Sequence, residues 1–454
     1  MLRKNTRHFA ETRTDEHRAD RLKGTKAAAR RLRPLHCSAL CAILVGLLAP
    51  SLQAGWNPGE PVTTYWAGPG FPGNDRLSDK WLAQLKEGGF NTVWAMSVEE
   101  LDLAAKYGMR VIFRLPDISD KILDKPEAEE SATAKLIARI KDHPALYIYS
   151  IHDEPPVSLF APLARKKTWI ARHDPNHAVW VNLLPTYANN KQLGVEGEII
   201  RAYWEHVRLF GEIFRPEFIT YDHYQFTRNG DNPNYLLNLG IIRQSASAQQ
   251  VPFWNGVQAC TWVPGSAASP SSPRIPGSDE MRFLVYTTAA YGAQGIYYYV
   301  YCHPRHEGSI VALDGTPDEK FETLKILNRE FIAIAKELAP LRFTGAYLQG
   351  IHAPGTTPWC EQALLKISPE TPASELEPKK ELTDTTLVSR FEAPGKPTHL
   401  MVVNLDYRKD RTVRITAPCA VSQFDALKRT WTSVGNNSFD LTLLRGSGIL
   451  LRLD

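Results

Sequence analysis

Two acidic residues stand together directly after an apolar run. The run Leu146–Ile151 is followed by His152, Asp153 and Glu154, and then by two prolines. Carboxyl groups at the end of a buried strand are costly to hold without a purpose, because burial disfavours their ionised form. A carboxylic acid that keeps its proton near neutral pH is a general acid. The segment therefore indicates acid–base chemistry, and the alternative is that Asp153 and Glu154 cap the helix that follows.

Other apolar runs also end in acids, amides and flat aromatic side chains. These residues are Tyr65, Trp66, Asp117, Asn182, Tyr187, Tyr221, Asp222, His223, Tyr224, Gln258, Trp262, Tyr299 and Tyr301. Sugar hydroxyls need hydrogen-bond partners, and the C–H faces of a sugar ring stack on aromatic rings. If the runs end in one cleft, the mixture predicts a carbohydrate site. Taken singly, the tyrosines are explained by packing and the histidines by buried hydrogen bonds.

Eight short apolar runs alternate with amphipathic segments from residue 62 to about 340. They are Val62–Trp66, Thr92–Met96, Val111–Leu115, Leu146–Ile151, Val179–Leu184, Phe218–Tyr221, Phe253–Gln258 and Ile296–Tyr301. Most are continuous, which is typical of parallel strands covered on both faces. Eight strand–helix units predict a (β/α)8 TIM barrel, whose active-site face is built by the loops after the strands. A doubly wound open sheet is the alternative, but no Gly-x-Gly-x-x-Gly follows the first run.

Helix signals fill the intervals between these runs. Ser78 is expected to cap one helix, and Ser97 with Glu100 forms a capping-box pattern at the start of the next. Further helices are expected over roughly 127–142, 158–173, 196–214, 233–249, 279–291 and 317–338.

The pattern changes after about residue 342. Short apolar runs then follow with little helix between them, at Thr398–Leu405, Thr412–Ala417, Ser438–Leu444 and Gly448–Leu453. We expect residues 55–341 to form the barrel and residues 342–454 a C-terminal antiparallel, β-sandwich-like domain that depends on it. Ser368–Leu382 and Gly265–Gly277 are expected to be loops, and the second follows the seventh strand.

The first 54 residues have the pattern of an export signal. Residues 1–36 hold 11 Lys/Arg and 4 Asp/Glu, and the apolar run Cys37–Pro50 is 14 residues long, which fits a signal peptide better than a membrane span. We expect cleavage after Ala54 and export to the periplasm or the cell exterior, with a retained signal anchor as the alternative. Without the leader the formal charge falls from +4 to −3, so the body has no electrostatic footprint for nucleic acid. No later apolar run predicts stable membrane insertion.

Four cysteines lie beyond the leader: Cys260, Cys302, Cys360 and Cys419. In an exported protein the first two and the last two could each pair, and four buried thiols are the alternative. There is no Cys-x-x-Cys, His-x-His or His-Glu-x-x-His, so neither a metal nor a cofactor is expected.

The segment His143–Leu146, followed by a strand and then by Asp153-Glu154-Pro155, resembles the fourth-strand region of the (β/α)8 glycoside hydrolases of the retaining clan that includes cellulases and β-galactosidases. In that clan a strand-four Glu, usually preceded by Asn, is the general acid/base, and the resemblance carries this role to Glu154. Pro252–Gln258 is similar to the clan's seventh strand, which ends in a Glu nucleophile. Met401–Asn404 resembles part of the C-terminal domains of such enzymes.

Two positions depart from the clan. Asp153 stands where the clan has Asn, and Gln258 stands where it has the nucleophile. An Asp-Glu pair on strand four is instead similar to hexosaminidases, in which the substrate's acetamido group attacks, the Asp steadies it and the Glu is the acid. The segment Tyr221-Asp222-x-Tyr224 resembles chitinase-type barrels, without their long acidic strand-four motif. The nucleophile therefore stays open, as does the choice between retaining, inverting and substrate-assisted routes.

The residues and the resemblance together predict an exported glycosidase that hydrolyses a polysaccharide or oligosaccharide. Such hydrolysis requires two carboxyl groups, for which we select Glu154 as the acid and Asp222 as the second carboxylate. The expected sugar-binding residues are Trp66, Asp117, His152, Asp153, Asn182, Tyr221, His223, Tyr224, Gln258, Trp262, Tyr299 and Tyr301. The alternative is a non-catalytic carbohydrate-binding protein on a degenerate barrel, which Gln258 favours. A serine hydrolase is not supported, because no Gly-x-Ser-x-Gly is present.

Overall fold

The computed structural model describes residues 55–262, 269–359, 364–371, 373–376 and 381–454. The predicted leader and Cys360 lie outside the described residues, as do parts of the two expected loops Gly265–Gly277 and Ser368–Leu382. Within the described part, no helix has the length and apolar character needed to cross a bilayer.

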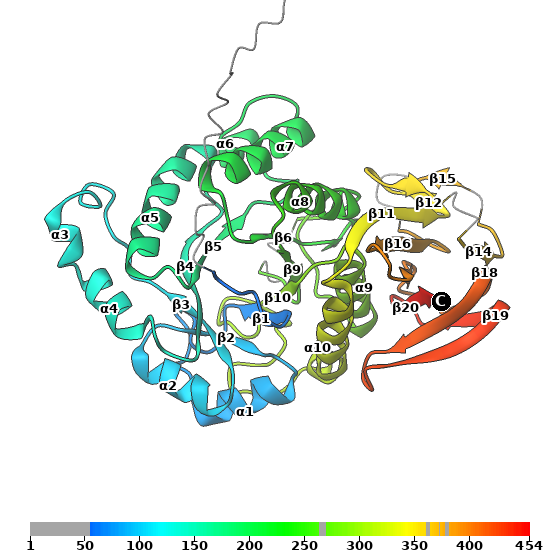
Figure 1. The fold of residues 1–454 in the computed structure, drawn as a ribbon, viewed down its shortest axis with the longest axis horizontal. Coiled ribbons are helices and arrows are strands. Elements are labelled where there is room, and N and C mark those ends of the chain that lie inside the picture. Colours follow the sequence, from blue (N-terminus) through cyan, green and yellow to red (C-terminus); the bar gives the residue numbers. More distant parts are fainter. Residues whose placement is uncertain (1–54, 263–268, 360–363, 372, 377–380) are drawn as a thin grey trace, which may run out of the picture. The chain divides into compact units, whose positions relative to one another are not determined.

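Eight parallel strands form a nearly closed barrel, which confirms the predicted fold class (Figure 1). In hydrogen-bonded order they are β1 (Val62–Trp66), β10 (Gly295–Tyr299), β9 (Phe253–Gln258), β6 (Ile219–His223), β5 (Ala178–Leu183), β4 (Leu146–Asp153), β3 (Arg110–Arg114) and β2 (Thr92–Ala95). Asn91 joins β1 to the start of β2. Its backbone N–H donates to the carbonyl of Thr63 at 3.2 Å, and its Oδ1 accepts from the Thr63 N–H at 3.0 Å.

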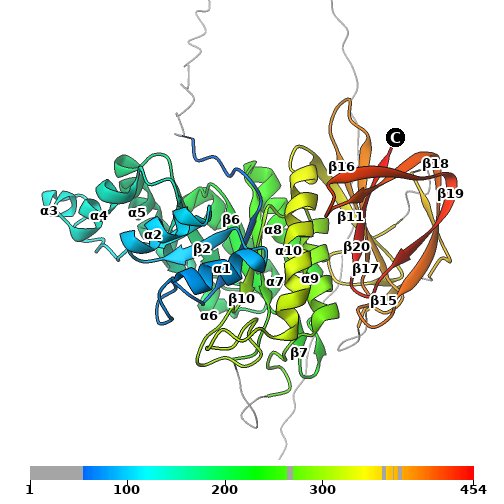
Figure 2. The same ribbon diagram turned by 90° about the horizontal axis from the view of Figure 1, so that it is seen from below.

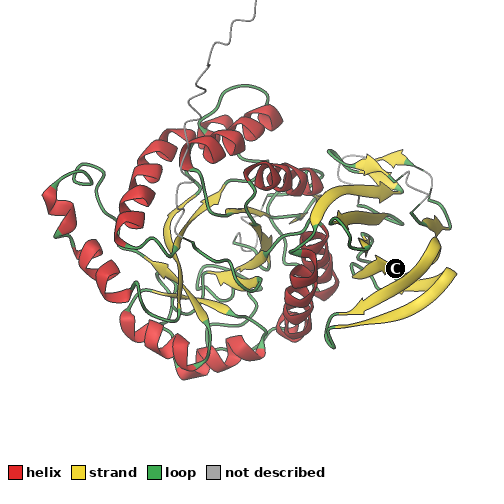
Figure 3. Ribbon diagram, viewed as in Figure 1, coloured by secondary structure: helices red, strands yellow, loops and turns green. Residues whose placement is uncertain are grey.

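Helices surround the strands of the barrel (Figure 3). They are α1 (Asp79–Glu87), α2 (Val98–Lys106), α3 (Pro126–Glu129), α4 (Ala132–Ile140), α5 (Phe160–His173), α6 (Asn190–Leu193), α7 (Ile199–Leu209), α8 (Tyr235–Gln249), α9 (Ser278–Ala290) and α10 (Glu319–Leu338). A 3₁₀ turn, Val157–Leu159, precedes α5, and a π-helical turn, Phe210–Phe214, follows α7.

The two expected N-caps differ in how completely they form. Ser78 Oγ accepts from the N–H of Trp81, as expected. Ser97 Oγ also accepts from the N–H of Glu100, but the Glu100 carboxylate does not complete the capping box. It accepts instead from the backbone N–H groups of Leu77 and Met96, which ties two loops to the start of α2.

Aromatic rings fill the barrel interior below its carboxyl-end mouth. The ring centroid of Trp180 lies 5.5 Å from that of Trp254 and 5.3 Å from that of Tyr297. Trp56, which precedes β1, lies 5.1 Å from Phe218 near the start of β6. The interior is therefore a packed core, and a ligand can enter only where the strands end.

A second, mostly antiparallel sheet follows α10, and α9 and α10 lie between it and the barrel strands (Figures 1 and 2). Its order is β13 (Thr357–Pro358), β11 (Arg342–Gln349), β16 (Thr386–Glu392), β17 (Thr398–Asn404), β20 (Gly448–Leu453), β18 (Arg411–Asp425) and β14 (Lys366–Ser368), with β19 (Thr430–Leu443) paired to β18. Two short ribbons pair β12 (Ile351–His352) with β15 (Ser374–Glu375), and β7 (Phe226–Thr227) with β8 (Gly230–Asp231).

The side chains of β17 alternate between two apolar cores. Met401 and Val403 belong to the core that also contains Leu284 of α9, whereas Leu400 and Val402 belong to a separate core inside the second sheet. This is the period of two that a strand imposes on its side chains. The second sheet therefore buries one face of β17 against the barrel helices.

Cys260, Cys302 and Cys419 are free thiols. The Cys260–Cys302 disulfide considered above is not formed, and Cys260 Sγ instead donates to the carbonyl of Tyr299 at 3.3 Å. Burial raises the pKa of both the Cys260 and the Cys302 thiol to about 12, which keeps them protonated and unreactive.

Candidate active site

Three carboxyl groups meet at the carboxyl end of the barrel. Asp153 ends β4, Glu154 follows it and Asp222 lies in β6. Asn182 of β5, the strand between them, ties two of the groups together, because its Nδ2 donates to Asp153 Oδ1 at 3.2 Å and to Asp222 Oδ1 at 2.8 Å. Since both oxygens bind one nitrogen, they can be no farther apart than the sum of these distances, about 6 Å.

The orientation of the Asn182 amide is fixed from its other side. Its Oδ1 accepts from the hydroxyl of Tyr297 at 2.6 Å. The Tyr297 hydroxyl donates, so the atom it binds must be the amide oxygen and the NH₂ group must face the carboxylates. Tyr297 thereby positions the donor that holds Asp153 and Asp222 together.

The backbone of Glu154 adopts an uncommon conformation. Its φ is +47°, in the left-handed region that residues other than glycine rarely occupy. Its N–H donates to the carbonyl of Asn182 at 2.9 Å, which holds the chain in place as it leaves β4. A left-handed residue of this type costs of order 1–3 kcal/mol and is typical of functional sites.

The three carboxyl groups disfavour one another's charge. Burial and the negative charge of Asp222 raise the pKa of Asp153 to about 7. Burial, with the charges of Asp222 and Asp153, raises the pKa of Glu154 to about 8. Both side chains reach solvent through the mouth, and protein surrounds their other sides. Burial also raises the pKa of Asp222, but hydrogen bonds from Tyr224 and Asn182 stabilise its charged form.

These hydrogen bonds decide where the proton lies. Asp222 has two donors that favour a carboxylate, whereas within the described residues no hydrogen bond stabilises a charged Glu154. Near neutral pH the arrangement therefore keeps a proton on Glu154 and a negative charge on Asp222. This is the division of labour that a general acid and a charge-stabilising partner need.

An aromatic wall stands beside the carboxyl groups. Tyr224, Trp262 and Tyr299 are half-buried, and the ring centroid of Tyr224 lies 4.8 Å from that of Trp262 and 5.1 Å from that of Tyr299. Trp66 of β1 packs near Tyr297 at 6.3 Å. Aromatic faces beside hydrogen-bonding groups suit the two sides of a sugar ring.

Three predicted site residues lie in the layer between strands and helices instead. Tyr221 is fully buried, the Nδ1 of buried His223 lies 3.0 Å from Asn238 Oδ1 of α8, and the hydroxyl of Tyr301 donates to Gln84 of α1. Burial lowers the pKa of His223 to about 4, so the ring is neutral. These side chains support the barrel and present no group to its mouth.

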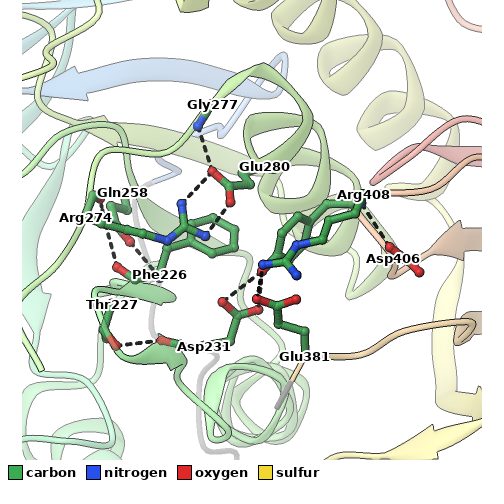
Figure 4. A network of polar contacts seen from close by, with 12 residues as sticks. Phe226, Thr227, Asp231, Gln258, Arg274, Gly277, Glu280, Glu381, Asp406 and Arg408 are labelled. Carbon is green, nitrogen blue, oxygen red and sulfur yellow. Dashed lines mark hydrogen bonds and ion pairs between the residues drawn. The ribbon is translucent and has the colours of Figure 1, made fainter. Parts of the chain in front are cut away.

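Gln258 braces two loops (Figure 4). Its Oε1 accepts from the N–H of Phe226 at 2.9 Å, and its Nε2 donates to the carbonyls of Phe226, at 3.0 Å, and Arg274. Both amide hydrogens are used and the side chain is fully buried. The structure thus gives Gln258 a structural role and leaves it no free donor for a sugar.

Asp117 and His152 lie beside the carboxyl cluster rather than in it. Asp117 is exposed and pairs with Lys166 of α5 at 2.7 Å. His152 is half-buried, and burial together with the positive charges of Arg114 and Lys166 lowers its pKa. These residues form a charged flank of the mouth on its β3–β4 side.

The sequence patterns place Tyr187 among the strand-end residues of the cleft but do not select Tyr297 or His306 as sugar-binding residues. The Tyr187 hydroxyl accepts from the N–H of Tyr224 at 3.3 Å, and His306 Nε2 lies 2.8 Å from the hydroxyl of Tyr299. Alternation along the eighth run would have paired Tyr297 with Tyr299 on the inward face. Nothing in the sequence signals His306, which lies in the loop after β10. Within the described residues, no cluster of three or more His, Cys, Asp or Glu is arranged to hold a metal.

No protein-family model and no curated protein matches the chain. Solved structures with a similar fold include a β-glucuronidase from Bifidobacterium dentium, at 14% identity over 59% of this chain and 46% of that one, with a TM-score of 0.40. A glucosidase from Croceicoccus marinus matches at 11% identity over 87% and 97%, with a TM-score of 0.42. An endo-β-1,3-glucanase from Amycolatopsis mediterranei matches at 12% identity over 59% and 99%, with a TM-score of 0.36.

Each of these three structures is that of a glycoside hydrolase. The chain spans about half the length of the two β-glucuronidases that it matches. Identities this low do not transfer the role of any residue. The chemistry of the chain's own carboxyl cluster must carry the functional conclusion.

Proposed function

We propose that this protein is an exported glycoside hydrolase that cleaves O-glycosidic bonds with Glu154 as its general acid. The observation that carries the proposal is the group of three carboxyls at the barrel mouth, one of which, Glu154, receives from the described residues no hydrogen bond that would favour its charge. A protonated carboxyl at the open end of a barrel can donate to the leaving oxygen of a glycoside.

Asp222 supplies the second charge. It is only 2% exposed, and its carboxylate accepts hydrogen bonds from Asn182 and Tyr224. A negative charge fixed beneath the sugar ring stabilises the positive charge that develops at the sugar carbon as the bond breaks. Asp153 lies beside both groups and strengthens the field that keeps Glu154 protonated.

The proposed substrate is an oligosaccharide or polysaccharide. The half-buried rings of Tyr224, Trp262 and Tyr299 offer faces for stacking, and the carboxyl cluster offers partners for hydroxyl groups. Export is proposed on the basic stretch and the short apolar run that precede residue 55.

A glycan panel tests the proposal. The chain from residue 55 onward is incubated with oligosaccharides and polysaccharides of varied sugar and linkage, and new reducing ends are measured. We expect hydrolysis of at least one substrate, and its loss in Glu154→Gln with sugar binding retained. Hydrolysis that persists in Glu154→Gln contradicts the acid assignment.

One observation favours a second candidate, a non-catalytic carbohydrate-binding protein. Gln258 stands at the strand-seven position where the resembling enzymes carry their nucleophile, and its amide is committed to the backbone. Binding of a glycan without release of reducing ends from any member of the panel would support this alternative.

A further inference from the structure

The proposed reaction lacks an obvious nucleophile. Gln258 is neutral and fully engaged, and Asp222 is too buried to touch a sugar carbon. A hydroxyl nucleophile must be reachable from the mouth and must have a base within hydrogen-bond distance. One side chain next to Gln258 meets both conditions.

Tyr299 is the lateral neighbour of Gln258 in the barrel. It ends β10, and its Cα is the register partner of Gln258 on β9 and of Trp66 on β1. The side chain is half-buried, and its ring belongs to the aromatic wall with Tyr224 and Trp262. Its hydroxyl therefore lies at the level of the strand ends, beside the position at which the clan's nucleophile would stand.

Two histidines extend from the Tyr299 hydroxyl in a hydrogen-bonded chain. His306 Nε2 lies 2.8 Å from the Tyr299 hydroxyl, and His306 Nδ1 lies 2.8 Å from His303 Nδ1. The backbone N–H of Arg305 donates to that same His303 Nδ1 at 3.2 Å.

This last contact assigns the protons. Because His303 Nδ1 accepts from a backbone N–H, it carries no hydrogen, and the hydrogen between the rings belongs to His306 Nδ1. A neutral His306 then has a bare Nε2, which must accept from the Tyr299 hydroxyl. The phenol proton thus points at a base, and within the described residues no donor binds the oxygen lone pairs of Tyr299.

The charge state of His306 agrees with this assignment. Burial and the nearby His303 and Arg305 lower the pKa of His306 to about 4. The ring is therefore in its neutral, proton-accepting form at neutral pH. A nucleophile bound to a base that a third group orients is the arrangement shared by enzymes with activated hydroxyl nucleophiles.

We propose that Tyr299 is the nucleophile of the reaction, with His306 as its general base and His303 as the residue that positions His306. The inference rests on the glycosidase function proposed above and names the group that attacks the sugar carbon.

The two chemical steps balance. In the first step, Tyr299 Oη bonds to the sugar carbon, its proton passes to His306 Nε2, and Glu154 gives its proton to the leaving oxygen, which departs as an alcohol. In the second step, the Glu154 carboxylate takes a proton from water, and the water oxygen bonds to the sugar carbon. The Tyr299 oxygen then leaves and recovers its proton from His306. All three side chains return to their starting state, and the product keeps its anomeric configuration.

A neutral nucleophile suits this site. Burial, together with the charges of Asp222, Asp153 and Glu154, raises the pKa of the Tyr299 hydroxyl, so it keeps its proton until His306 accepts it. A fourth carboxylate among these three would raise their mutual repulsion, whereas a phenol enters the reaction uncharged. The imidazolium and the positive sugar carbon that develop in the first step are both stabilised by the same negative field.

Covalent trapping tests the proposal directly. The protein is treated with a panel of 2,4-dinitrophenyl 2-deoxy-2-fluoroglycosides, which slow the second step, and is then digested and sequenced by mass spectrometry. We expect one fluoroglycosyl group on the peptide that contains Tyr299, and none on that peptide in Tyr299→Phe. A label on Asp153, Glu154 or Asp222 overturns Tyr299 as the nucleophile.

Kinetics supply the second readout. We expect Tyr299→Phe to lower kcat about 10³-fold or more with little change in KM, and His306→Gln to lower kcat about 10²-fold. The matched control is Tyr298→Phe, which removes the neighbouring hydroxyl that donates to Asn328 in the helix layer and should leave activity unchanged.

The outcomes separate the two proposals. Hydrolysis by the unaltered protein with inverted product, or with full activity in Tyr299→Phe, overturns the Tyr299 assignment and leaves the glycosidase function standing. If the unaltered protein hydrolyses no glycoside in either panel, the proposed function fails and the nucleophile assignment fails with it.

Discussion

Carboxyl groups with raised pKa values lie both at the barrel mouth and in the β7–β8 ribbon. At the mouth, burial and mutual repulsion raise the pKa of Asp153 and Glu154. In β8, burial raises the pKa of Asp231 to about 7. There the hydroxyl of Tyr407, from the segment between β17 and β18, lies 3.1 Å from both Asp231 oxygens.

The difference lies in what surrounds each group. The two oxygens of Asp231 share one donor, the Tyr407 hydroxyl, and the positive charge of Arg274 is nearby, while neighbouring Glu381 is paired with Arg408. Glu154 has no such partner among the residues that the structure describes, and its side chain is exposed. A raised pKa alone does not distinguish a carboxyl that joins two structural elements, such as Asp231, from a candidate catalytic one, such as Glu154. The better candidate for catalysis is the carboxyl that solvent can reach and that has no hydrogen-bond donor beside it.

Among substitutions in these two regions, Glu154→Gln is expected to have the largest effect on the rate of hydrolysis. The amide keeps the shape of the side chain but has no acidic proton, so hydrolysis of unactivated glycosides should fall about 10²–10⁴-fold. Aryl glycosides with a good leaving group need less acid assistance and should be hydrolysed at a partly restored rate. Initial rates on both kinds of substrate measure the effect, and equal losses on both would contradict the acid role.

Asp222→Asn should affect both kinds of substrate alike. The change removes the charge beneath the sugar ring, which serves bond breaking whatever the leaving group, and we expect a loss of about 10²-fold or more in kcat. Asn can still accept from Asn182 and Tyr224, so the fold should survive. A loss confined to unactivated substrates would show that Asp222 acts as an acid instead.

The mouth carboxyls should also leave a signature in stability. A carboxyl whose folded pKa is raised contributes most to stability at low pH, and that contribution is lost as pH rises from its unfolded pKa, about 3.9 for Asp, to its folded pKa. For Asp153 the folded value is about 7. Asp153→Asn should therefore raise Tm more at pH 8 than at pH 5.

Thermal melts at the two pH values measure this effect. Asp124→Asn is the matched control, because the exposed Asp124 carboxylate pairs with Arg165, which keeps its charge at both pH values, and it should show no such pH-dependent gain. An equal change in Tm at both pH values for Asp153→Asn would mean that repulsion at the mouth is weak.

The smallest effect on activity is expected for Tyr407→Phe. Loss of the donor leaves Asp231 without its hydrogen bonds and should destabilise the protein by about 1–3 kcal/mol, a fall of a few degrees in Tm. Activity on glycosides should change less than about threefold, because Tyr407 lies outside the mouth. A loss of activity close to that of Glu154→Gln would contradict the distinction between a structural carboxyl at Asp231 and a catalytic one at Glu154.

Most of the barrel was predictable because its signals are local. Continuous apolar runs define the eight strands, and the run Phe253–Gln258 coincides with β9. The second sheet was harder to predict, because its first strand β11 has mostly half-buried side chains and no clear alternation. Its long hairpin, β18 with β19, was recognised only in part, since much of β19 is exposed and polar.

The acidic residues of the candidate site could be predicted from the sequence, whereas the directions of its aromatic side chains were harder to predict. Polar strand ends located Asp153, Glu154 and Asp222, but consecutive strand residues point to opposite faces. Tyr221 and His223 therefore turn toward the helices while Asp222 turns inward. Contacts from distant loops, such as that of His306 with Tyr299, depend on tertiary folding and leave no trace in local sequence.

The three hydrogen bonds of Gln258 limit which residues can replace it. A glutamate at this position would keep one acceptor but lose both donors, and its charge would face the carbonyl oxygens of Phe226 and Arg274. A glutamate at position 258 would thus weaken the contacts between the segments around Phe226 and Arg274. A catalytic acid could be placed here only if both segments were changed with it.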